Sequence, residues 1–141
     1  MSAATYTAEQ AAIEGRLAAQ WVDGQDDPLT PIAWPNVQFT PPDGPYLEAR
    51  INNQQSFPRE IPAQGGTKSF PGLLTLNVYA ALNQGEGSIT ALAQTAIDIF
   101  EDVTVSGIVF RSPWIANRGE HGARWRIQVD CPFERITHTP A

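Results

Sequence analysis

The sequence predicts an α+β fold: a mostly antiparallel sheet of about four main strands, with two helices packed on one face, plus a long loop or hairpin. The clearest evidence is the stretch from Arg124 to Glu134, in which polar and apolar side chains alternate strictly. Its apolar face consists of Trp125, Ile127, Val129, Cys131 and Phe133. Such a period of two indicates a strand with one face on a core. Two alanine-rich segments instead carry apolar residues at helical spacing.

The first helix is expected at about residues 7 to 22. Thr7 and Gln10 form a capping-box pattern, and an apolar stripe follows at Ile13, Leu17 and Trp21. A second helix is expected after Ser88, which can cap it. Its stripe consists of Ile89, Leu92, Ala93, Ala96, Ile97 and Phe100.

Four stretches have the character of strands. They are residues 46–51, 72–82, 103–110 and 124–134. A glycine-containing turn is expected at 117–122, just before the last strand. The order of elements is helix, strand, long loop, strand, helix, strand, strand.

The segment 52–69 is expected to be a protruding loop or hairpin. A long loop without structure is uncommon in a small domain unless it is functional. Its centre carries Phe57, Arg59, Glu60 and Ile61, which combine two apolar groups with both signs of charge. That mixture suits a surface that is wet in the monomer and dry in an assembly. We therefore take these residues as candidate interface residues.

Composition restricts the class of protein. The length of 141 residues predicts a single domain, 1–141. The formal net charge of −6 argues against a nucleic-acid-binding domain, whose footprint would be basic. The single cysteine excludes an internal disulfide. No stretch has the roughly 18 apolar residues that span a bilayer, so we expect no membrane contact.

No catalytic, cofactor-binding or metal-binding set is found. Gly85 and Gly87 lie between a strand and a helix, but Thr90 stands where a dinucleotide fingerprint needs a small residue. Cys131 falls on the apolar face of its strand, unlike a reactive thiolate. Two histidines and one cysteine do not supply a typical zinc site. We expect no enzyme activity and no cofactor.

Three further residues are candidates for contact with partners. Trp114 lies in a proline-flanked segment, where an exposed aromatic side chain marks a partner surface or covers the edge of the core. Arg124 and Arg126 lie on the polar face of the last strand and are suited to bidentate pairing with carboxylates. The alternative for both arginines is an ordinary solvated strand face, whose ion pairs contribute little.

The order of these pieces resembles the tail terminator, or tail completion, proteins of long-tailed phages and phage-like particles. The resemblance covers most of the chain, and no single piece is specific. It rests on the helix ending in Gln20-Trp21, the run from Ile32 to Leu47 with its Trp-Pro-Asn and Pro-Pro-Asp-Gly-Pro pieces, the strand from Gly72 to Tyr79, and the closing strand through Cys131-Pro-Phe133.

The resemblance implies a structural protein without chemistry. Its copies would form a ring, commonly six-fold, that caps the head-proximal end of the tail tube, ends tube growth and offers a surface to the neck. The partners would be other copies of the chain, the tail tube protein and a neck or stopper protein. DNA would pass through the lumen without specific binding. The place would be the tail–neck junction of a virion or phage-like particle assembled in the host cytoplasm. The alternatives are another neck ring protein, a stopper or adaptor, and a small enzyme with an unrecognised site.

Overall fold

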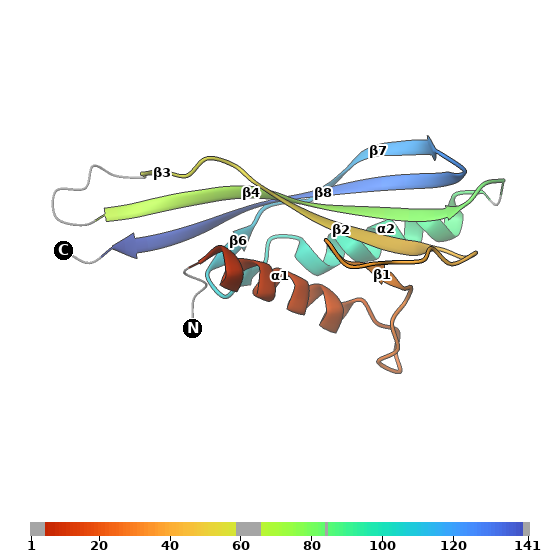
Figure 1. Ribbon diagram of the computed structural model, residues 1–141, viewed down its shortest axis with the longest axis horizontal. Coiled ribbons are helices and arrows are strands. Elements are labelled where there is room, and N and C mark those ends of the chain that lie inside the picture. Colours follow the sequence, from red (N-terminus) through yellow and green to blue (C-terminus); the bar gives the residue numbers. More distant parts are fainter. Residues whose placement is uncertain (1–4, 59–65, 84, 140–141) are drawn as a thin grey trace.

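The computed structural model describes residues 5–58, 66–83 and 85–139, and it consists of one eight-stranded sheet and two helices (Figure 1). The elements in chain order are α1 (Tyr6–Gln20), β1 (Ile32–Ala33), β2 (Tyr46–Asn53), β3 (Phe57–Pro58), β4 (Gly66–Ala81), α2 (Gly87–Phe100), β5 (Thr104–Val105), β6 (Ile108–Phe110), β7 (Trp114–His121) and β8 (Arg124–Thr139).

The sheet is larger than the sequence predicts. Its strand order is β1-β2-β4-β8-β6-β5, with β3 also paired to β4 and β7 also paired to β8. Strand β1 runs parallel to β2 and every other pair is antiparallel, so the sheet is mixed. Strand accounts for 45% of the structure and helix for 23%. The expectation of an α+β fold with about four main strands is therefore wrong: strand pairing dominates this fold.

Two physical reasons explain why the sequence analysis counts fewer strands than the structure contains. Strands β1, β3 and β5 contain two residues each, which is too short for alternation to show in the sequence. The predicted strand 103–110 is divided by a turn at Ser106 and Gly107, both at positive φ. The predicted turn at 117–122 is instead the second half of β7, and the true turn lies at Gly122. A register shift between Ile115 and Asn117 conceals the period of β7.

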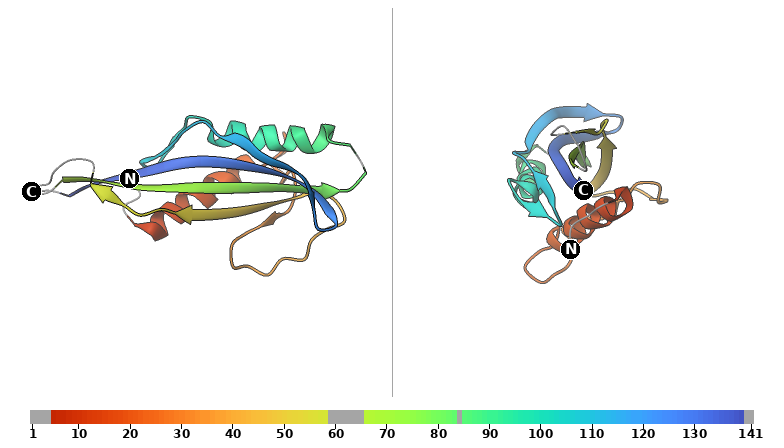
Figure 2. Two further views of the ribbon diagram at one scale, coloured as in Figure 1. Left: turned by 90° about the horizontal axis from the view of Figure 1, so that it is seen from above. Right: turned by 90° about the vertical axis from the view of Figure 1, so that its left-hand side faces the viewer.

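Both helices lie on the same side of the sheet (Figures 1 and 2). The hydrophobic core lies between the helices and the sheet and is built from residues of both. Helix α1 begins at Tyr6, one residue earlier than expected, because Thr5 rather than Thr7 caps it: the Thr5 hydroxyl accepts a hydrogen bond from the Ala8 amide at 3.1 Å. Its predicted stripe is confirmed, since Ile13, Leu17 and Trp21 are fully buried. The predicted core face of the last strand is buried at Ile127, Val129, Cys131 and Phe133, whereas Trp125 is half-buried.

Strands β4 and β8 pair along their whole length, from Gly66 opposite Thr139 to Ala81 opposite Arg124. This two-stranded ribbon of β4 and β8 extends past the helices, as Figure 1 shows at the left. The core ends at a close contact, where a Cβ atom on Gly72 would lie 2.3 Å from the ring of Phe133. We call the extension beyond this contact the arm: residues 57–58 of β3, 66–71 of β4 and 134–139 of β8.

Candidate assembly surfaces

The arm is paired strand without a hydrophobic core. The segment 52–69 contributes Asn52 and Asn53 to β2, the short strand β3 and the start of β4, while residues 59–65 lie outside the described part. Phe57 pairs with Ser69 across β3 and β4, and its side chain is 48% exposed. None of the described arm residues belongs to the apolar core cluster. Backbone pairing therefore holds the arm together, and its surface is available to a partner.

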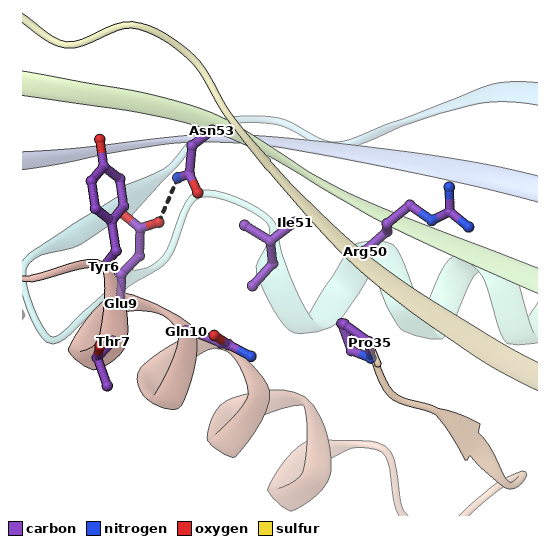
Figure 3. Close-up of a pocket in the computed structure, with 8 residues that line it drawn as sticks. All are labelled: Tyr6, Thr7, Glu9, Gln10, Pro35, Arg50, Ile51 and Asn53. Atoms are coloured by element: carbon purple, nitrogen blue, oxygen red, sulfur yellow. Dashed lines mark hydrogen bonds between the residues drawn. The ribbon is translucent and has the colours of Figure 1, made fainter. Parts of the chain in front are cut away.

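A buried ion pair ties the root of the arm to α1. The Arg135 Nε atom donates to Glu9 Oε2 at 2.7 Å, and the two side chains are 1% and 2% exposed. The Asn53 side chain donates to the other Glu9 oxygen at 2.7 Å, as Figure 3 shows. One carboxylate on α1 therefore joins the end of β2 to the last part of β8.

Aromatic rings enclose the guanidinium of the same pair. Its central carbon lies 4.2 Å from the ring centroid of Phe70 and 5.0 Å from that of Tyr6. The rings of Tyr6 and Phe70 meet edge to face, with their centroids 5.8 Å apart. Cation–π contacts gain strength when they are removed from water, as here. We name Tyr6, Glu9, Asn53, Phe70 and Arg135 the root cluster.

The opposite face of the arm root carries a second polar contact. The buried Ser69 hydroxyl donates to the Glu134 carboxylate, and Arg111 lies 3.7 Å from the other Glu134 oxygen. Cross-strand register places Ser69 opposite Ile136 and Phe70 opposite Arg135, so these contacts lie on opposite faces of the ribbon. The root is held from both sides.

A cleft of about 270 Å³ lies beside the root cluster, between α1 and β2 (Figure 3). Its walls are Tyr6, Thr7, Glu9, Gln10, Pro35, Arg50, Ile51 and Asn53. It follows the outer edge of β2, which β1 covers only at Leu47 and Glu48. Among the described strands none pairs with that edge from Ala49 to Asn53, and none pairs with the outer edge of β7. The long strands β2 and β7 thus each have an open edge in the described part of the chain.

The sheet face that the helices leave uncovered is polar and partly buried. Thr75, Asn77 and Asp130 are at most 8% exposed. The Thr75 hydroxyl donates to Asp130 at 3.2 Å, and the Asn77 amide donates to Glu48 at 3.0 Å. The sheet is strongly curled when viewed along its length (Figure 2), which encloses this face without a covering helix.

Arg124 is engaged within its own chain. Its guanidinium donates to the Gly44 carbonyl at 3.1 Å and to the Pro42 carbonyl, and it lies 4.9 Å from the ring of Tyr46. It thereby fastens the proline-rich loop to the end of the ribbon. Arg126, opposite Tyr79 in the register, is half-buried.

The candidate interface residues do not form one surface. Phe57 lies in the arm, while Arg124 and Arg126 lie at the other end of β8. Trp114 opens β7 at an open sheet edge and is 48% exposed. Arg59, Glu60 and Ile61 lie outside the described residues. Their roles in assembly stay predictions.

The root cluster was missed by the sequence analysis, although a signal for it exists. Glu9 lies four residues before Ile13 on the apolar stripe of α1, and Arg135 continues the buried alternation of β8 two residues after Phe133. Opposite charges at two core positions, one per element, indicate a buried ion pair. The length of β8 had to be known for Arg135 to be recognised.

Three further observations concern metal binding, the cysteine and membrane spans in the described residues. They contain no group of three His, Cys, Asp or Glu side chains placed to hold a metal ion. Burial raises the pKa of the Cys131 thiol far above its usual range, so it stays protonated and unreactive. No described helix is long and apolar enough to cross a bilayer.

Comparison with known proteins gives the class of this molecule. The sequence model described as "Phage tail terminator protein" matches residues 10–132, which defines a structural protein of phage tails. The chain belongs to the phage tail terminator family. Nine chains among solved structures match significantly; one of them superposes with a TM-score of 0.71 at 21% identity, over 99% of this chain and 100% of its own. That likeness shows the fold alone. A search of curated proteins found no significant match.

Proposed function

We propose that copies of this chain form a closed ring, with six as the expected number, that caps the head-proximal end of the tail tube. The ring ends tube growth and offers its free face to a neck or stopper protein. The proposal rests on the family match and on one structural observation, the open edges of β2 and β7 in the described part of the chain. DNA passes through the lumen without specific binding, in keeping with the net charge of −6.

The directions of the strands support ring closure. In the body the order is β2, β4, β8, β7, and each neighbour is antiparallel. The outer two of these four strands, β2 and β7, therefore run in opposite directions. A rotation about an axis along the strands would bring β7 of one copy beside β2 of the next, in antiparallel orientation. A contact between different edges closes into a ring when the rotation divides the circle evenly.

The experiment that tests this function uses purified full-length chain and tail tube protein. Native mass spectrometry should give a single closed oligomer, and electron microscopy should find it at one end of each tube. Tubes grown with the chain should have limited length, whereas tubes grown alone continue. Binding to a portal-side neck protein but not to the tube would indicate a stopper or adaptor. A monomer that leaves tube growth unchanged would overturn the proposal.

A further inference from the structure

The arm has little besides its root to fix its direction. Beyond the Gly72–Phe133 contact none of its described residues belongs to the apolar core cluster. At its root, Phe70 and Arg135 contact Tyr6 and Glu9 of α1, and β6 pairs with Glu134 and Arg135. A paired ribbon of this kind bends and twists readily. At the root cluster helix α1 contacts the β4–β8 ribbon, because Tyr6 and Glu9 come from the first turns of α1 and both lie against Arg135 of β8.

We propose that the root cluster is a latch that fixes the direction of the arm relative to α1. Glu9, Asn53 and Arg135 act as positioning residues for the contact between the arm and an assembly partner. The consequence for tube capping rests on the proposed function, whereas the direction of the arm does not.

The Glu9–Arg135 ion pair is better suited to fixing the direction of the arm than to stabilising the fold. Removing two charges from water costs about as much as their attraction returns, so a buried ion pair adds little net stability. Its hydrogen-bond directions are strict, however, because the 2.7 Å contacts of Glu9 with Arg135 and Asn53 use both carboxylate oxygens. Small changes in the angle between α1 and the ribbon would break these contacts. An apolar contact would tolerate the same change.

The shape of the guanidinium adds a second restraint. Phe70 belongs to β4 and Tyr6 to α1, and both rings lie within 5.0 Å of the Arg135 carbon. The arginine is thus held by side chains from α1 and from the neighbouring arm strand together. An arm fixed in advance loses less conformational entropy when it docks, and this raises affinity without any new contact.

The test compares the parent with the double variant Glu9→Leu and Arg135→Met. Both replacements keep apolar bulk in the cluster, and methionine packs well on aromatic rings. Spin labels at Ala18→Cys on α1 and Lys68→Cys on β4 report the distance between body and arm. Both positions are exposed, and the native Cys131 is fully buried. Labelled chain is diluted into unlabelled chain so that each distance lies within one copy.

We expect the double variant to fold and to assemble with unchanged mass, but to show a broader distribution of distances. On the order of tenfold more of it should be needed to cap the same number of tubes. A matched control, Gln94→Ala with Asp98→Ala, removes an exposed hydrogen bond of 2.8 Å on α2 and should behave like the parent. Asn53→Ala, at an exposed position that leaves the ion pair intact, should broaden the distribution to a lesser degree.

A distribution as narrow as that of the parent in both the double variant and Asn53→Ala would overturn the latch. A broadened arm with unchanged capping would overturn its positioning role. If the double variant does not fold, Asn53→Ala alone decides. If the parent itself does not cap tubes, the proposed function fails, and the distance measurement still tests the latch.

Discussion

The body and the arm are built from the same two strands, yet different forces hold them. In the body, β4 and β8 bury Leu74, Leu76, Val78, Ile127 and Val129 under two helices. In the arm, the same ribbon buries no apolar cluster, and its most buried side chains are Ser69 and Arg135. Apolar burial fixes the position of the body, whereas directional polar contacts fix that of the arm. One ribbon can thus provide a rigid scaffold at one end and a projecting contact element at the other.

The largest expected effect comes from a charge placed in the body. Ile127→Asp or Val129→Asp would bury an unpaired carboxylate at a fully buried position, which costs more than about 4 kcal/mol. We expect insoluble protein or loss of cooperative melting, measured by circular dichroism. The exposed Asn117 on the neighbouring strand β7 provides a control, since Asn117→Asp should melt close to the parent. Unchanged melting of Ile127→Asp would contradict the dominance of apolar burial in the body.

The sequence predicts the body better than the arm for the same physical reason. Apolar burial leaves a period in the sequence, and that period correctly identifies the face of Ile127 and the stripe through Ile13 and Leu17. Backbone pairing leaves no such trace, which is why β3 and the extension of β8 to Thr139 escape notice. The Glu9–Arg135 contact joins residues far apart in the chain, and its signal becomes readable only once β8 is known to extend to Arg135.

A smaller effect is expected when one charge of the root cluster is removed. Arg135→Met leaves Glu9 buried with only Asn53 as a described partner, and losing one member of a buried pair costs about 3–5 kcal/mol. Chemical denaturation should show this loss for Arg135→Met and for Glu9→Leu. The double variant should recover most of it. If the two single losses add up in the double variant, the charges do not interact as the structure shows.

The arm itself should contribute little to stability but much to assembly. Deletion of residues 54–64 removes β3, and none of the described residues among them belongs to the core, so the melting temperature should change little. We expect the shortened chain to fold and to lose tube capping, as scored by tube length in electron micrographs. Phe57→Ser is the milder counterpart, because it removes one 48%-exposed aromatic ring from an intact arm. Normal capping by the deletion variant would show that the arm is not an assembly element.

Arg124 and Arg126, at the end of β8 away from the arm, are expected to respond differently to substitution. Six copies would carry a formal charge of −36, six times −6, so positive groups at subunit contacts would offset repulsion. We keep the prediction that Arg124 and Arg126 lie near such contacts. Arg124→Lys should cost on the order of 1 kcal/mol of folding stability, since it loses the bonds to Pro42 and Gly44. Arg126→Glu should instead weaken ring formation at low salt, and an unchanged oligomer there would remove Arg126 from the interface.

The smallest effect concerns the stacked tyrosines at the same end of the ribbon. Burial raises the pKa of Tyr79 and of Tyr46 above the ordinary value of 10.0 for a tyrosine. The nearby Glu48 adds to this rise, while Arg124 beside Tyr46 and Arg126 beside Tyr79 act against it. Their rings stack at 4.8 Å. In the unfolded chain these phenols ionise first as the pH rises, so the folded form loses stability above pH 10.0 until the folded pKa is passed. The double variant Tyr46→Phe, Tyr79→Phe should show a shallower decline of melting temperature above that pH. Between pH 7 and 9 both phenols are neutral in the folded and in the unfolded chain, so the two substitutions should leave the pH dependence of stability unchanged there. Identical declines in the two proteins, with tyrosinate absorbance rising at the same pH, would show that burial does not hold these phenols neutral.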